Sequence, residues 1–147
     1  MLVSDIMTAN PITVGLDDTL RTAVEQMQTY TCRRLPVVNA DGALVGIITD
    51  RDTRLALHSP FVLHEKWEED ALLDSVKVRA CMTVTPIIVE PTADIEDAIR
   101  LMLRYRIGGL PVLRGETTVG IITSTDIMTA FVRYLRSQNR ITADNSD

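Results

Sequence analysis

The chain contains the same sequence twice. Leu35-Pro36-Val37 returns as Leu110-Pro111-Val112 after 75 positions, and VGIIT at 45–49 returns at 119–123 after 74 positions. A repeat of this length corresponds to a folding unit rather than to a short motif. A single unit of about 55–60 residues would be only marginally stable alone, because small units bury a smaller share of their surface. The sequence therefore predicts two similar halves that pack against each other.

Composition and charge exclude several classes of protein. The chain has 147 residues, of which 46% are hydrophobic, enough for a core. Its formal net charge is −5, with carboxylates concentrated between His64 and Asp74, so the basic excess needed for nucleic-acid binding is missing. No apolar run approaches the ~18 residues of a membrane span, and Asp5 lies where a signal peptide would be basic. We expect a cytoplasmic protein with neither a nucleic-acid nor a membrane partner.

The repeat also interprets the two cysteines. Cys32 corresponds to Ile107 and Cys81 to Ile6, so each cysteine replaces an apolar residue. Both are expected to be small core side chains rather than reactive thiols or disulfide partners.

Each half is predicted to contain the order strand, helix, strand, strand, helix. An extended piece at 11–14 precedes a helix with capping residues at 17–19. Asp41-Gly42 is a strong hairpin signal between strands at 35–38 and 44–49. The apolar face of the first helix recurs at helical spacing and consists of Leu20, Ala23, Val24, Met27 and Tyr30. Asp52 is expected to cap a second helix that ends near Leu57.

The second half repeats this order and ends in a longer helix. Its strands are predicted at 110–113 and 119–123, and its first helix is capped near Thr92 or Asp94. The apolar residues of that helix are Ile95, Ala98, Ile99, Met102 and Tyr105. The final helix carries Ile127, Ala130, Phe131, Tyr134 and Leu135 on one stripe. A short helix is expected in the connection, which contains Phe61, Val62, Leu63, Trp67, Leu72 and Leu73, and a frayed polar tail is expected after residue 136.

This ordered series of motifs, present twice, resembles a pair of CBS domains, a Bateman module. The residues that carry the resemblance are DIMT at 5–8, LPVV at 35–38, GIITDRD at 46–52, GGLPV at 108–112 and GIITSTD at 120–126. The resemblance implies an α/β fold of two β-α-β-β-α repeats packed with pseudo-two-fold symmetry. The expected divisions are a first repeat at 1–57, a linker at 58–77, a second repeat at 78–136 and a tail at 137–147.

The resemblance also implies a ligand. Family members bind AMP, ADP, ATP or S-adenosylmethionine in clefts between paired repeats, with the ribose held by Asp and Thr of the motif that begins with Gly46 or Gly120. One expected site therefore contains Ile87, Gly109, Leu110, Pro111, Thr123 and Asp126. The other contains Ile12, Arg34, Leu35, Pro36, Thr49 and Asp52. A carboxylate accepts both ribose hydroxyls, and a helix N-terminus attracts phosphate.

The same residues also have purely structural explanations. Asp52 and Asp126 are good helix caps, and the motif glycines relieve crowding whether or not a ligand binds. Arg33 and Arg34 correspond to Gly108 and Gly109. The arginines suit phosphate, although they also suit solvent or a pairing with the linker carboxylates, whereas the glycines leave room for a base. We therefore expect the site with Asp126 to be the principal one.

Two hypotheses of function follow. The first is a regulatory, non-catalytic module that binds an adenosine ligand, forms a homodimer and acts on a partner protein. The second is a ligand-free module for assembly with a partner. His58 and His64 lie near carboxylates without the spacing of a metal site, so no metal is expected. No nucleophile–base pair is apparent, which argues against an enzyme.

Overall fold

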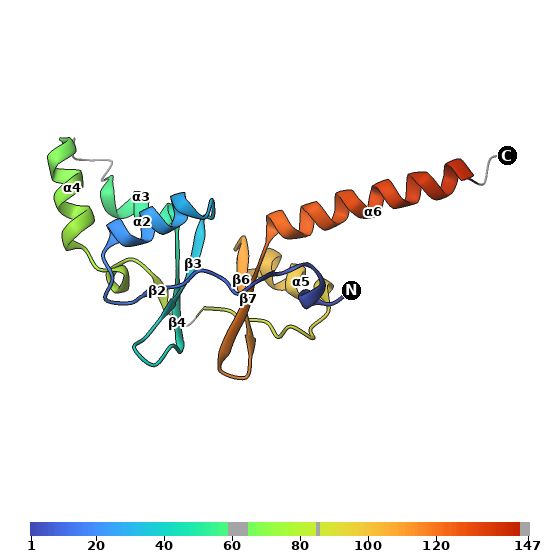
Figure 1. Cartoon of the computed structure of the whole chain (residues 1–147), viewed down its shortest axis with the longest axis horizontal. Helices are drawn as coiled ribbons and strands as arrows, with labels where there is room; N and C mark the ends of the chain where they lie inside the picture. The colour runs from blue at the N-terminus through green and yellow to red at the C-terminus, as the bar shows by residue number, and fades with distance from the viewer. Residues whose placement is uncertain (59–64, 85, 145–147) are drawn as a thin grey trace.

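The chain folds into two lobes, each built on a small β-sheet. The computed structural model describes residues 1–58, 65–84 and 86–144. The two sheets lie next to each other in the middle of the molecule, with the helices arranged around them (Figure 1). The predicted α/β class and the two-repeat architecture are confirmed. Within the described ranges, no helix is long and apolar enough to cross a bilayer.

The first lobe contains a four-stranded sheet in the order β2-β3-β4-β5. Its strands are β2 (Val14–Gly15), β3 (Arg34–Val38), β4 (Leu44–Thr49) and β5 (Thr83–Val84). Its helices are α2 (Leu20–Thr29), α3 (Asp50–Leu57), α4 (Lys66–Ser75) and the 3-10 turn η1 (Val78–Ala80). The β3–β4 hairpin turns through Gly42, at φ +79°, as the Asp-Gly signal predicts.

The second lobe contains a three-stranded sheet in the order β1-β7-β6. Its strands are β1 (Thr8–Ala9), β6 (Gly109–Arg114) and β7 (Thr117–Thr123), and β5 and β1 are counterparts in the repeat. Its helices are α1 (Val3–Ile6), α5 (Ile95–Tyr105) and α6 (Ser124–Asp144). Asp94 caps α5 by accepting a hydrogen bond from the backbone N–H of Glu96, so one of the two expected caps is the observed one.

The lobes exchange their opening segments. β1 pairs with β7, so the start of the first repeat completes the sheet of the second lobe. β5 pairs with β4, so the start of the second repeat completes the sheet of the first lobe. Val3 and its counterpart Val78 are both 0% exposed, and each lies in the core of the opposite repeat's lobe. The folded lobes therefore do not coincide with the sequence repeats.

This exchange explains the two motif glycines. A Cβ on Gly46 would lie 2.7 Å from both Sδ of Met82 and the carbonyl oxygen of Thr83. A Cβ on Gly120 would meet Met7 and Thr8 in the same way. Real Cβ atoms do not approach backbone this closely, so the glycines allow the exchanged strand to lie against the sheet.

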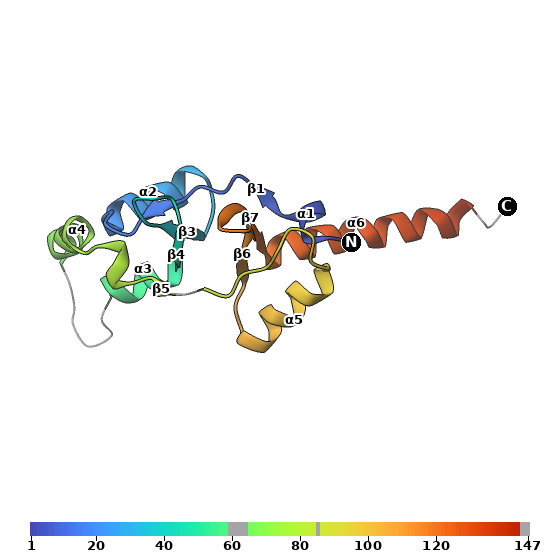
Figure 2. The same cartoon turned by 90° about the horizontal axis from the view of Figure 1, so that it is seen from below.

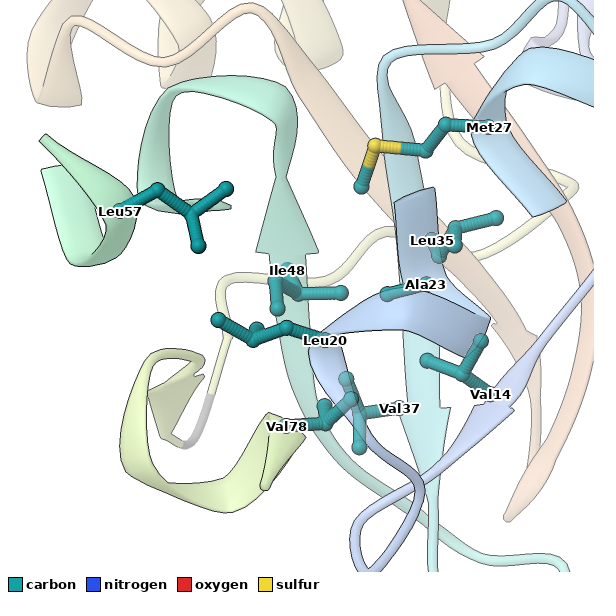
Figure 3. Close-up of a cluster of buried hydrophobic side chains, with 9 residues drawn as sticks. All are labelled: Val14, Leu20, Ala23, Met27, Leu35, Val37, Ile48, Leu57 and Val78. Atoms are coloured by element: carbon teal, nitrogen blue, oxygen red, sulfur yellow. The ribbon is translucent and has the colours of Figure 1, made fainter. Parts of the chain in front are cut away.

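The core of the first lobe lies between α2 and its sheet. Figure 3 shows Leu20, Ala23 and Met27 of α2 directed toward Leu35 and Ile48 of the sheet. Thr19 caps the helix by accepting from the backbone N–H of Thr22 at 3.3 Å. The predicted apolar face is confirmed for these three helix residues. Tyr30 and its counterpart Tyr105, however, lie beyond the last buried turn and are exposed.

Both cysteines contact this same core and are partly exposed. Cys32 and Cys81 pack against the buried cluster of the first lobe, consistent with their apolar counterparts. Burial raises the pKa of both thiols above the ordinary value, which reduces their thiolate fraction at neutral pH.

The connection between the repeats contains the expected helix, α4. Leu72 and Leu73 pack against the first core, and Arg21 of α2 bonds to Asp70 and Asp74 of α4. Trp67 is not part of this contact: it is 66% exposed, and its indole N–H donates to Glu65 at 3.0 Å. The apolar residues at 61–63 lie outside the described residues.

The expectation of a frayed tail is wrong for most of its length. α6 continues from Ser124 to Asp144 without interruption. In both views it extends beyond the second lobe, away from the two sheets (Figures 1 and 2). Residues 137–144 extend a helix that is already nucleated, and adding residues to an existing helix needs no new nucleation step.

Candidate functional site

Each repeat has a reciprocal pair of hydrogen bonds where its hairpin enters the following helix. In the first repeat, Asp52 Oδ2 accepts from the backbone N–H of Thr49 at 2.9 Å, and Thr49 Oγ1 accepts from the backbone N–H of Asp52 at 3.2 Å. In the second repeat, Asp126 Oδ2 accepts from both the N–H and the hydroxyl of Thr123, each at 2.8 Å. These are capping boxes.

The capping roles differ from those expected. Thr49, rather than Asp52, is the N-cap of α3, and Asp52 is the third residue of the helix. One carboxylate oxygen of each aspartate is therefore engaged locally. The other oxygen has no hydrogen bond among the described residues and remains available to a ligand hydroxyl.

A pocket of about 580 Å³ lies between the lobes. This volume is within the range of small-molecule sites, roughly 300–1,000 Å³. Its first-repeat wall consists of Arg33, Arg34, Ile47, Thr49, Asp50, Arg51 and Arg54. Its second-repeat wall consists of Thr83, Pro86, Ile87, Arg106, Ile107, Gly108, Gly109 and Pro111.

The pocket combines residues from both predicted sites. Arg34 and Thr49 from one predicted set face Ile87, Gly109 and Pro111 from the other. Leu35 and Leu110 are 0% exposed in the two cores, so neither residue presents surface to this pocket. The predicted site residues that do not line this pocket are Ile12, Leu35, Pro36, Asp52, Leu110, Thr123 and Asp126.

The reason for this combination is the exchange of β1 and β5. Ile87 follows β5, which pairs with β4, the strand that ends at Thr49. Ile87 of the second repeat therefore lies beside Thr49 of the first repeat, where α3 begins. Sequence alignment of the repeats does not reveal this, because it compares each segment with its own counterpart and not with its neighbour in space.

Arg34 occupies the space that the glycines were expected to leave for a base. A Cβ on Gly108 would overlap the Arg34 guanidinium, and a Cβ on Gly109 would lie 2.9 Å from Cδ of Arg34. Arg34 and Gly109 are counterparts in the repeat, so they face each other across the pseudo-two-fold axis. The space between these two positions holds only one large side chain, which is that of Arg34. The expectation of an open space beside Gly108 and Gly109 is therefore wrong for this conformation.

The electrostatics of the pocket are strongly positive. Asp50 bonds to Arg54 at 2.8 Å, which compensates both charges. Partial burial, together with the nearby charge of Arg33, lowers the pKa of the Arg34 guanidinium. The residues that line the pocket include no other carboxylate.

Sequence reasoning missed Arg106 as a pocket residue. It follows α5 in the left-handed conformation, with φ 53°. Its counterpart Thr31 has φ 51°. The only available signal was its position directly before Ile107-Gly108-Gly109, and helix periodicity does not report it.

The histidines form no recognisable metal site. Nε2 of His58 lies 3.0 Å from Glu69 of α4, and both groups are at the surface. His64 lies outside the described residues. Among the residues with described positions, no group of three or more potential metal ligands gathers.

Comparison with known proteins gives consistent results. The family model for the CBS domain matches residues 3–59 and 78–133. A CBS domain-containing protein of Dictyostelium discoideum is 36% identical over 136 residues, covering 92% of this chain and 94% of that protein.

Solved structures agree over both repeats. The CBS domain pair of protein MJ0100, in complex with 5'-methylthioadenosine and S-adenosyl-L-methionine, has a TM-score of 0.76 at 27% identity and covers 91% of this chain and 98% of that one. CBSX2 in complex with AMP has a TM-score of 0.75 at 27% identity, covering 90% and 97%.

Proposed function

The chain belongs to the CBS domain family, and on that premise we propose that it is a regulatory, non-catalytic module that binds an adenosine-containing ligand between its repeats. The candidate ligands are AMP, ADP, ATP and S-adenosylmethionine. The observation that carries the proposal is the pocket of about 580 Å³ in which Thr49 of one repeat faces Ile87 and Gly109 of the other. Binding of AMP and of S-adenosylmethionine by similar CBS pairs supports it.

The residues have complementary roles in this proposal. Ile87 forms an apolar wall for the adenine, beside Arg34, whose side chain covers Gly108 and Gly109. Thr49 lines the pocket and contacts the ribose. Asp52 does not line it but holds Thr49 through the capping box, and its free carboxylate oxygen is proposed to turn toward the ribose, because a carboxylate oxygen accepts from a hydroxyl. The pocket arginines contact the phosphates.

The pseudo-two-fold symmetry predicts a second cleft. It combines Thr123 and Asp126 with Ile12 and with the start of β3, where Arg34, Leu35 and Pro36 lie. Here Arg33 and Arg34 replace the two glycines. Because Thr49 rather than Thr123 lines the large pocket, we place the principal site there, the reverse of the order expected from the sequence.

Calorimetry with AMP, ADP, ATP, S-adenosylmethionine and NAD tests the proposal. We expect at least one of the four adenosine candidates to bind, and Asp52→Asn to weaken that binding by about 10-fold or more, since it removes a charged acceptor. Asn preserves an acceptor for the Thr49 N–H, so the helix cap survives.

Asp126→Asn is the matched control because it makes the same change in the other capping box. We expect it to weaken binding less. Equal effects of the two substitutions would refute the assignment of the principal site. Binding of none of the panel would favour the alternative, a ligand-free assembly module.

We also propose that the protein is a homodimer through α6. Phe131 is 58% exposed on this helix, and the apolar stripe continues through Met128, Val132 and Leu135. An exposed stripe of this extent is typical of an interface, and two-fold pairing is the usual arrangement.

A further inference from the structure

Four arginines of the pocket between the lobes have no carboxylate partner among the described residues. Asp50 bonds to Arg54, so that pair is close to neutral. No side-chain ion pair or hydrogen bond to a carboxylate involves any of the other four pocket arginines, within the part of the chain that the structure describes. These four are Arg33, Arg34, Arg51 and Arg106.

Three of the seven arginines outside the pocket whose side chains are described do have carboxylate partners. Arg21 bonds to Asp74, Arg79 to Asp17 and Arg100 to Glu96. The surface of this acidic protein therefore supplies carboxylates to several arginines, yet the pocket retains an excess of uncompensated positive charge. Such a concentration of like charge in a concave site is costly unless an anion neutralises it.

Arg34 is the most buried of the four. It is half-buried, whereas Arg33, Arg51 and Arg106 are exposed. Its side chain crosses from β3 of the first lobe onto Gly108 and Gly109 of the second. A guanidinium in this position has lost part of its hydration, and an anion with several oxygens is the partner that restores its hydrogen bonds.

Resting on the proposed function, we infer that this pocket selects nucleoside di- and triphosphates over uncharged or cationic adenosine compounds, and that Arg34 determines this specificity. The planar fork of Arg34 matches the oxygens of a polyphosphate. The exposed Arg33, Arg51 and Arg106 lie around the same pocket and add long-range attraction. S-adenosylmethionine carries a sulfonium and an ammonium group, and these meet the arginines as like charges.

Calorimetry on the full chain tests this inference with ATP, ADP, AMP, adenosine, S-adenosylmethionine and inorganic tripolyphosphate, each at low and high salt. We expect affinity to fall from ATP to AMP by about 10-fold or more, and ATP binding to weaken with salt. Arg34→Gln should lower ATP affinity by about 10-fold while leaving adenosine affinity unchanged. Gln keeps part of the side chain over the two glycines and removes only the charge.

Arg114→Gln is the control, because Arg114 is an exposed arginine at the end of β6 that does not line the pocket. It should leave every affinity unchanged. Equal ATP affinity in wild type and a folded Arg34→Gln variant would overturn the role of Arg34. Binding of adenosine or S-adenosylmethionine as tight as that of ATP would overturn the inference but leave the proposed function intact.

Tripolyphosphate separates the remaining outcomes. If tripolyphosphate, ATP and ADP bind whereas AMP, adenosine and S-adenosylmethionine do not, the selectivity for polyphosphates holds. If neither tripolyphosphate nor any adenosine compound binds, the inference and the proposed function are both wrong.

Discussion

Single residues show how far one repeat can differ from the other without changing the fold. Thr31 and Arg106 both lie just after a helix in the left-handed conformation. In each case the next residue donates its N–H to a carbonyl five residues earlier, from Cys32 to Met27 and from Ile107 to Met102, at 3.0 Å. This is the Schellman arrangement, in which glycine is preferred. Both repeats therefore retain the turn with residues that are disfavoured in it.

Thr31→Gly should stabilise the protein. Thr31 is β-branched and has φ 51°, a conformation that is strained for such a residue. Glycine removes the strain but loses more entropy on folding, so we expect a net gain of about 1 kcal/mol in the free energy of unfolding. Urea denaturation followed by circular dichroism measures it. Arg106→Gly is the paired variant, with a smaller expected gain. An unchanged or lower midpoint for Thr31→Gly would show that the left-handed turn carries no strain.

At the scale of elements, the sequence predicted what local chemistry determines. The β4 range of 44–49 is the observed one, and the helix faces around Ala23 and Ala98 are buried as expected. Contacts made over long distances could not be predicted. Periodicity cannot say which sheet a two-residue strand joins, so the pairing of β1 with β7 was missed, and with it the true composition of the pocket. The exposure of Trp67 was missed for the same reason.

α6 provides the test of dimerisation. Phe131→Gln combined with Leu135→Gln should convert a dimer into a monomer at tens of micromolar protein, roughly the range in which a weak interface still forms. Gln is a good helix former, so the helix itself should survive. Sedimentation equilibrium measures the mass. Arg133→Gln, also exposed on α6, should leave the dimer unchanged. A monomeric wild type, or a double variant that remains dimeric, would rule out this interface.

At the scale of the whole molecule, the two lobes depend on each other. Val3 completes the second core and Val78 the first, although each comes from the opposite repeat. Each lobe consequently lacks part of its core unless the other repeat is present. This reciprocal exchange predicts that the lobes unfold together, as a single cooperative transition.

Val3→Ala and Val78→Ala should each lower the free energy of unfolding by about 2 kcal/mol, because each leaves a cavity in a fully buried site. Urea unfolding followed by two probes, circular dichroism and Trp67 fluorescence, should give coincident curves for each variant. Trp67 reports on the first lobe, so a Val3→Ala variant tests whether damage to the second lobe reaches the first. Val84→Ala is the control, since Val84 is 64% exposed. Separate transitions would show that the lobes are independent.

The exchanged opening segments also have an evolutionary consequence. An ancestral gene that encoded one repeat would produce a chain whose own opening strand, the equivalent of β1 and β5, belongs in another molecule. Two identical chains could satisfy each other by mutual exchange, forming a symmetric pair in which every ligand cleft is shared. Duplication and fusion of such a gene would join the two chains without requiring any new contact. After fusion, the two facing positions would be free to diverge, as Arg34 and Gly109 differ here.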